Sequence, residues 1–340
     1  MLSKNFGRTA DSSPRRRGQI IFNRNQLLNL LKILISLGLM AFIIATVDLS
    51  ALARTLLNAR PGFLLVALGL VMIGVVLRAW RWQILLHDQG VRVGLKELTG
   101  LWFISFLFNN LLPSGIGGDA VKIYELSRSS ERGAETVSSV LVDRFLGIMG
   151  LLGLALVALF FSWRLIPIEV VVLTVGIFGA GLVGGFLVID QSLWRALQAR
   201  LPLLRRVDEI KTVKSFIDSL GRYRLRALLR SFGVSVLFNL SLIAMNVFIG
   251  LSLGLRINLT FYFVFVPLTS LVLILPISVG GLGAREQTYI TLFAQAGVPQ
   301  ESALALSLLV YALGNLATGL VGGVLYLSRG ARRLAVEREA

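Results

Sequence analysis

Long apolar runs dominate this sequence and restrict its fold more than any other feature. A helix needs about 20 apolar residues to cross a hydrocarbon core of about 30 Å. Only helices and closed barrels satisfy every backbone hydrogen bond in lipid, so runs of this length predict an all-α, polytopic transmembrane helical bundle. The runs cover approximately 26–47, 63–77, 98–112, 136–161, 166–189, 227–253, 259–275 and 300–327.

Charge and composition agree with a membrane protein and exclude several other classes. Charged residues make up 15% of the chain, against about 25% in soluble domains. The net charge is +16, and the basic residues that produce it lie between and beside the apolar runs. Positive charge in these positions sets membrane orientation, so we expect no nucleic-acid partner. With no cysteine and one histidine, disulfides and thiolate catalysis are excluded, and we expect no metal and no cofactor.

The apolar region separates two basic tails, at 1–25 and 329–340, from a membrane domain at 26–328. Within it, 190–226 is the longest polar segment and carries apolar residues at the spacing of one helix face. This pattern predicts an amphipathic basic helix on an anionic leaflet, and a solvated cytoplasmic connector is the alternative. The apolar face consists of Val213, Phe216, Ile217 and Leu220.

Two segments, 111–119 and 275–286, interrupt the pattern of apolar helices in the same way. Each follows a short apolar run, breaks it at a proline, and continues through glycines to charged residues. Such a break inside lipid must be buried in protein or line a wet cavity. The predicted hinge residues are Pro113, Gly115, Gly117 and Gly118 in the first break, and Pro276, Gly280, Gly281 and Gly283 in the second.

The distribution of Lys and Arg indicates that both breaks are re-entrant. Suppose that the N-terminus is cytoplasmic and that every apolar run crosses the membrane. The basic residues of 119–133 and 190–230 would then lie on the external side. With re-entrant breaks, 27 of the 34 basic residues become cytoplasmic, as the positive-inside rule requires. We therefore predict about six full spans plus two oppositely oriented re-entrant hairpins, in a cell inner membrane with both termini cytoplasmic.

Two similar breaks of opposite orientation are typical of inverted-topology repeats that meet near the bilayer midplane, as in many transporters. Convergent use of Pro-Gly breaks is the alternative. Helices should begin near Asp119 and Arg285, and helix N-termini favour anions, phosphates in particular. Lys122 and Arg285 are thus predicted to reach an anionic headgroup, with Asp119 and Glu286 as their ionic partners or as helix caps.

Asp143 and Arg144 form a third acidic–basic doublet, early in the 134–162 helix. Neighbouring residues on a helix do not face each other, so we expect them to have different partners, with Lys122 facing Asp143. A structural ion-pair network is an equally supported role. The candidate substrate-binding residues are Asn110, Ser114, Asp119, Lys122, Asp143, Arg144, Ser278, Arg285 and Glu286.

Other polar and aromatic residues in the apolar runs have simpler expected roles. Buried asparagines in membrane helices usually form interhelical hydrogen bonds, and cavity lining is the alternative; they are Asn109, Asn110, Asn239, Asn246 and Asn315. Tryptophans are typical of membrane interfaces, and we expect this position for Trp80, Trp82, Trp102, Trp163 and Trp194.

These motifs resemble those of the lysylphosphatidylglycerol synthase transmembrane-region family, flippase-like proteins related to the membrane half of multiple peptide resistance factors. The likeness covers most of 26–328. It rests on Asn110 to Gly115, Gly118 to Lys122, Ser139 to Arg144, Pro276 to Glu286, and Gly322-Gly323. The family pattern usually has Arg at Lys122 and Glu at Asp143. The lysine ammonium is a point charge without the planar fork by which arginine binds two phosphate oxygens. The resemblance implies lipid translocation or lipid-linked metabolism and leaves the substrate open.

The sequence therefore favours translocation of a lipid with a polar headgroup, anionic or lipid-linked. No nucleotide-binding G-x-x-x-x-G-K-[ST] motif occurs, so transport would be downhill or ion-coupled. One alternative is a polytopic glycosyl- or phospho-transferase in which Asp48 or the Asp119 group acts as acid or base. Another is a membrane partner that anchors a lipid-modifying enzyme through 190–226.

Overall fold

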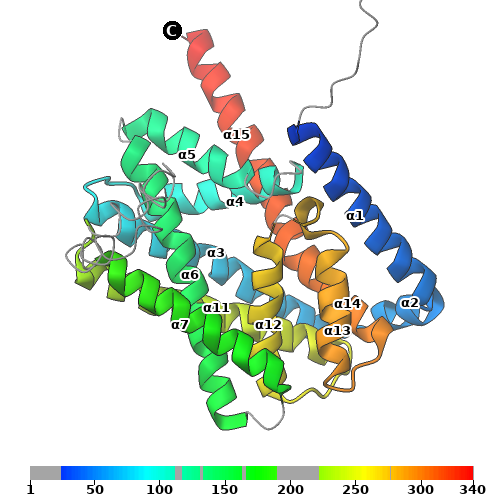
Figure 1. The fold of residues 1–340 in the computed structure, drawn as a ribbon. Coiled ribbons are helices and arrows are strands. Elements are labelled where there is room, and N and C mark those ends of the chain that lie inside the picture. Colours follow the sequence, from blue (N-terminus) through cyan, green and yellow to red (C-terminus); the bar gives the residue numbers. More distant parts are fainter. Residues whose placement is uncertain are drawn as a thin grey trace, which may run out of the picture.

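The computed structural model describes residues 24–111, 117–130, 133–162, 166–189, 222–275 and 277–339, and its regular structure is helical throughout these ranges (Figure 1). The first half contains α1 (Arg24–Thr46), α2 (Leu49–Leu57), α3 (Pro61–Asp88), α4 (Leu95–Leu111), α5 (Gly117–Ser130), α6 (Gly133–Ser162) and α7 (Ile168–Ile189). The second half contains α11 (Leu225–Ser252), α12 (Leu259–Ile274), the 3₁₀ turn η2 (Val279–Gly281), α13 (Ala284–Ala294), α14 (Gln300–Tyr311), the π-helical η3 (Ala312–Ala317) and α15 (Thr318–Glu339).

Five helical segments of the described chain are long and apolar enough to cross a membrane. They are α3, α6, α7, α11 and the continuous segment from α14 through α15. A sixth candidate is the pair α1 and α2, which bend by 87° at their junction. The prediction of an all-α, multi-pass membrane protein with about six spans is confirmed.

The second predicted span, 63–77, is wrong at its C-terminal end. Helix α3 continues to Asp88, so Arg78 and Arg81 lie inside the helix and not in a cytoplasmic loop. Arg81 is only 4% exposed. A buried arginine persists in a membrane helix when it has an ionic partner, and Arg81 has one in α6, described below.

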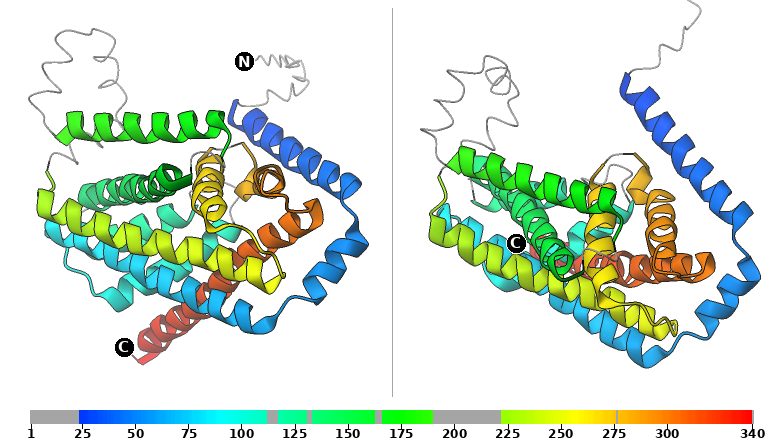
Figure 2. Two further views of the ribbon diagram at one scale, coloured as in Figure 1. Left: turned by 90° about the horizontal axis from the view of Figure 1, so that it is seen from below. Right: turned by 60° about the horizontal axis from the view of Figure 1, so that its bottom comes forward.

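Helices α3 and α11 form an extensive contact and run antiparallel beside each other (Figure 2). Gly74 of α3 faces the ring of Phe238, and the Ser241 hydroxyl donates to the Leu70 carbonyl at 2.9 Å. Helix α6 packs against both, and Asn239 of α11 reaches its backbone. The small and polar residues at these contacts allow close approach, as in other membrane bundles.

Helices α4 and α5 form a hairpin whose two ends lie at one end of the bundle. Asp88, at the C-terminus of α3, accepts from the Arg224 amide just before α11 at 3.0 Å. Ser139, early in α6, accepts from Trp82 Nε1 at 2.8 Å, so α6 also begins at this end. Because α4 follows α3 and α5 precedes α6, the hairpin starts and finishes there.

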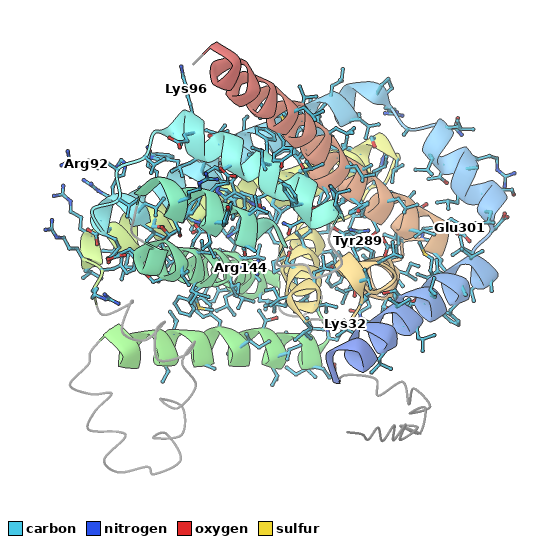
Figure 3. All side chains as sticks on the ribbon, turned by 90° about the horizontal axis from the view of Figure 1, so that it is seen from above. Lys32, Arg92, Lys96, Arg144, Tyr289 and Glu301 are labelled. Carbon is cyan, nitrogen blue, oxygen red and sulfur yellow. The ribbon has the colours of Figure 1, made fainter. Side chains whose placement is uncertain are left out.

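Helices α12 and α13 form a second hairpin that belongs to the opposite end. There the Arg60 amide donates to the Ser252 carbonyl at 2.9 Å, joining the start of α3 to the end of α11. Gln300, at the start of α14, donates to Thr46 of α1 at 3.1 Å. In Figure 3, Arg92 and Lys96 lie at one end of the molecule and Glu301 at the other.

The order of helix lengths occurs twice along the chain. Helices α3 to α6 have 28, 17, 14 and 30 residues. Helices α11, α12 and α13 have 28, 16 and 11 residues and are followed by the long α14–α15 segment. This order supports inverted repeats, while the re-entrant insertion of each hairpin into a bilayer stays a prediction.

Cysteine labelling tests that insertion directly, because the chain has no cysteine of its own. We expect Arg128→Cys, in the last turn of α5, to react with an impermeant thiol reagent from the same face as Lys96→Cys. We expect Gln295→Cys, after α13, to react from the opposite face, together with Glu301→Cys. Reaction of Arg128→Cys and Gln295→Cys from one face would contradict the paired re-entrant arrangement.

Candidate functional site

A buried ionic group forms where α5 meets α6. Asp119, in the first turn of α5, uses both carboxylate oxygens. Oδ1 lies 2.8 Å from Nζ of Lys122, and Oδ2 accepts from Nε of Arg144 at 2.5 Å. Lys122 is 2% exposed, whereas the Arg144 side chain is 46% exposed. One carboxylate therefore pairs with two cations. Of these two, only Arg144 has an exposed side chain that could also contact another molecule.

Asp143, the neighbour of Arg144, points elsewhere and binds Arg81 of α3. Nε and Nη2 of Arg81 each donate to one carboxylate oxygen at 2.6 Å, a bidentate pair with both side chains buried. Nη1 of Arg81 donates to Ser235 of α11 at 3.2 Å. Separate partners for Asp143 and Arg144 are confirmed, but the expected Asp143–Lys122 pair is wrong, because Arg81 occupies Asp143. We call Arg81, Asp119, Lys122, Asp143 and Arg144 the charge cluster.

The first turn of α5 is held by polar contacts from α4. The Asn109 side chain accepts from the amide of Gly118 at 2.8 Å, which satisfies one of the free N–H groups at a helix start. A Cβ on Gly118 would overlap the carbonyl and hydroxyl oxygens of Ser105. Glycine is therefore required here for the close approach that places Asp119 and Lys122 inside the bundle.

Two tryptophans form walls of the charge cluster, so their predicted interfacial position is wrong. Trp82 and Trp102 are 1% and 9% exposed. Nζ of Lys122 lies 3.3 Å from the ring centroid of Trp102 and 5.3 Å from that of Trp82. A cation over an indole face is stabilised by the ring quadrupole, which explains how Lys122 stays buried with a single carboxylate. Trp163 and Trp194 lie outside the described residues.

Arg285 and Glu286 form a second buried ion pair at the start of α13. Nη2 and Nε of Arg285 donate to Oε1 of Glu286 at 2.5 and 3.1 Å. Oε2 of Glu286 accepts from the Gly283 amide at 2.7 Å. Glu286 thus serves both as ionic partner and as helix cap, the two roles expected as alternatives.

The second break depends on glycine at three positions. Gly280, Gly281 and Gly283 have φ of 60°, 80° and 78°, values that L side chains rarely adopt. Ser278 lies half-buried just before them. Ser36 of α1 accepts from the Val279 amide at 2.8 Å, so α1 covers the break.

The two breaks are connected through α14 and the π-helical turn η3. The Arg285 guanidinium lies 4.1 Å from the ring centroid of Tyr311, and the Tyr311 hydroxyl lies 3.5 Å from Oδ1 of Asn110 at the end of α4. Nδ2 of Asn110 donates to the Asn315 carbonyl at 2.8 Å. Single π-turns often occur at functional sites, and this one joins the hairpins.

Most predicted site residues within the described ranges fall into these two groups. Interhelical hydrogen bonding is confirmed for Asn110, for Asn239, which donates to Gly147 at 3.1 Å, and for Asn246, which accepts from Tyr289 at 2.6 Å. Gly117 begins α5 and is buried. The remaining predictions lie outside the described residues: Pro113, Ser114, Gly115, Pro276, the N-terminal tail to residue 23, and nearly all of the amphipathic segment, at 190–221.

Arg78 and Arg81 are the site residues that the sequence analysis missed. They stand three residues apart, so they share a face of α3, and an apolar stretch from Ile84 to Leu86 follows them. Apolar residues resume after this arginine pair, and this pattern indicates that the helix continues beyond it. Arg78 lies over three aromatic rings, with its Cζ 4.3 Å from the Phe238 centroid.

Comparison with known proteins places these motifs in a family. The family model described as "Lysylphosphatidylglycerol synthase TM region" matches residues 29–322. A UPF0104 membrane protein of Pyrococcus horikoshii is 26% identical over 335 residues, covering 90% of this chain and 98% of the relative. A UPF0104 membrane protein of Methanothermobacter thermautotrophicus is 27% identical over 302 residues, covering 80% and 88%.

Proposed function

Because the chain belongs to the lysylphosphatidylglycerol synthase TM region family, we propose that this multi-pass membrane protein moves a lipid with an anionic headgroup between the leaflets. The observation that carries the proposal is an excess of positive charge inside the bundle. Four cations lie close together there, and three of them are paired with Asp119 or Asp143. The cations are Arg78, Arg81, Lys122 and Arg144.

Shared aromatic rings support the view that these cations form one site. The Phe238 ring lies 4.3 Å from Arg78 and 5.9 Å from Arg81. The Trp102 ring lies 5.4 Å from Arg78 and 3.3 Å from Lys122. An anionic headgroup that enters this site meets a net positive charge in surroundings of low dielectric constant, where electrostatic attraction is strong.

The cost of moving a charge through lipid explains why such a site would promote translocation. A charged side chain at the bilayer centre costs about 2.5–3.5 kcal/mol on insertion scales, and more in simulations. Cations held within the bundle would offset this cost for a phosphate. Two hairpins that start from opposite ends and are linked through Tyr311 and Asn110 offer a path from each leaflet to one site.

The transferase alternative requires a carboxylate that is free to exchange protons. Oδ1 of Asp48 accepts from the Ser50 amide, the Ser50 hydroxyl and the Ala51 amide at 2.8, 2.7 and 3.1 Å. These bonds give Asp48 the role of N-cap of α2. Asp119 is held by two cations. The geometry therefore favours transport over transferase chemistry.

Arg144→Gln is the variant that tests the proposal with least damage to the fold. Arg144 is half-exposed, and Asp119 keeps Lys122 as a partner, so the substitution leaves no buried charge unpaired. In vesicles containing fluorescent phosphatidylglycerol, we expect wild-type protein to accelerate exchange between leaflets and Arg144→Gln to slow it about tenfold. The measurement is the rate at which inner-leaflet label becomes accessible to dithionite.

The matched control is Arg256→Gln, which removes an exposed arginine from the loop between α11 and α12 and should keep the wild-type rate. Exchange no faster with wild-type protein than in protein-free vesicles would refute translocation. Mass spectrometry of the recovered lipid separates the transferase, which would alter the headgroup, from a transporter, which would not.

A further inference from the structure

Arg78 differs from every member of the charge cluster in having no carboxylate beside it. Within the described ranges, Arg81, Lys122 and Arg144 are each paired with an aspartate, whereas Arg78 forms neither an ion pair nor a side-chain hydrogen bond there. Its guanidinium carbon lies 5.4, 5.4 and 4.3 Å from the ring centroids of Trp102, Phe106 and Phe238. Cation–π contacts hold the side chain in place but leave its charge uncompensated.

The guanidinium lines a cavity of about 150 Å³ between α3, α4, α11 and the π-helical turn. The cavity lies near the middle of α3 and α11, which corresponds to the centre of the membrane if both helices span it. Three of its lining residues have polar side chains: Arg78, Ser241 and Asn315. An unpaired cation in such a position is costly, and a ligand of opposite charge would relieve the cost.

The donors and acceptors in the cavity define the chemistry of that ligand. A guanidinium presents a planar fork of N–H groups that matches two phosphate oxygens. The backbone carbonyl of Asn315 accepts from Asn110. Asn315 also lines the cavity, and its side-chain amide carries N–H groups that can donate to a ligand. The Ser241 hydroxyl donates its hydrogen bond to the Leu70 carbonyl, so its oxygen is available as an acceptor for a hydroxyl group of the ligand.

The cavity size limits which part of a lipid can enter. An engineered cavity of 150 Å³ takes a molecule the size of benzene, and sites for drug-sized ligands have about 300–1,000 Å³. The volume suits a phosphate group but not a pair of acyl chains. The acyl chains must therefore stay in the bilayer while the headgroup enters.

We propose that this cavity is the phosphodiester-binding site of a glycerophospholipid substrate, with Arg78 as the phosphate contact and Asn315 as a second donor. The assignment rests on the proposed function, which supplies the lipid. It distinguishes Arg78 from Arg81, Lys122 and Arg144, each of which already has Asp119 or Asp143 as an ionic partner. Arg78 thereby binds the phosphate directly, and the charge cluster contributes to the electrostatic potential around it.

Binding can be measured without transport, because Trp102 lies against Arg78. Full-length protein in detergent is titrated with dihexanoyl phosphatidylglycerol while tryptophan fluorescence is recorded. We expect saturable binding for the wild type and a loss of signal in Trp102→Phe. We expect at least tenfold weaker binding for Arg78→Gln and for Asn315→Leu, and intermediate binding for Arg78→Lys, which keeps the charge without the fork.

The controls separate the sources of the signal. Arg92→Gln, an exposed arginine outside the cavity, should bind as the wild type does. Dihexanoylglycerol, which lacks the phosphate, should not bind. Affinity for inorganic phosphate equal to or above that for the lipid would overturn the lipid assignment, and Arg78→Gln binding within twofold of wild type would overturn the role of Arg78.

The two proposals fail in different ways. Binding that depends on Arg78, together with wild-type protein that moves no lipid in vesicles, supports the site and refutes translocation. Lipid exchange by the wild type that is unchanged in both Arg78→Gln and Arg78→Lys supports translocation and refutes the site.

Discussion

We expect Asp143→Asn to lower the free energy of unfolding by about 3–5 kcal/mol, the range typical when one partner of a buried ion pair is removed. The substitution keeps the shape of the side chain but takes away the charge that Arg81 faces through two bonds of 2.6 Å. Arg81 then remains buried as an uncompensated cation among α3, α6 and α11. The expected result is a marked fall in the unfolding temperature of the protein in detergent, measured by intrinsic tryptophan fluorescence.

The double variant Arg81→Gln/Asp143→Asn separates the effect of losing the ion pair from the effect of leaving one buried charge unpaired. It replaces two charges with two neutral groups that can still hydrogen-bond, so it should recover much of the lost stability. A double-mutant cycle with Arg81→Gln gives the coupling energy. Equal stability of Asp143→Asn and the wild type would contradict the pairing.

Gly322→Ala has the second large effect, because α15 and α4 approach each other at this glycine. A Cβ on Gly322 would overlap the backbone carbonyl of Phe103 and lie 3.1 Å from the amide nitrogen of Ile104. Backbone atoms of a packed helix cannot move aside singly, so the helices must separate. Overpacking of this kind costs about 1–3 kcal/mol, and occasionally more, and the unfolding midpoint should fall accordingly.

The adjacent glycine provides a matched control. A Cβ on Gly323 would meet only a methyl group of Leu107, at 3.7 Å, which is ordinary van der Waals contact. Gly323→Ala makes the same chemical change in the same helix, and alanine has a helix propensity better by about 1 kcal/mol. We expect it to be neutral or stabilising. Equal destabilisation by both variants would show that α15 does not lie on α4 as described.

The fold was largely predictable because membrane helices follow from local hydropathy. The run at 227–253 is α11, at 225–252, and the run at 259–275 is α12, at 259–274. The failure at α3 has a physical cause. Local hydropathy falls at Arg78 and Arg81, but the carboxylate that allows Arg81 to be buried lies 62 residues away in the sequence.

The candidate site was predictable in its residue types but not in its pairings. Charged residues that follow a Pro-Gly break indicated Asp119, Lys122, Arg285 and Glu286. Which cation meets which carboxylate depends on the crossing of α3, α5 and α6, which no local pattern encodes. The buried position of Trp102 was hidden for the same reason, because its partner Lys122 belongs to another helix.

The last membrane crossing has a mechanical consequence. It touches the second hairpin through Tyr311, which lies against Arg285, and the first through Gly322, which lies on Phe103. The π-helical turn η3 lies between these residues and shifts the register of the helix. As a result, α14 and α15 present different sides to the helices that they contact. One continuous helical segment thus contacts both hairpins, and we expect movement of either hairpin to act on the other directly through it.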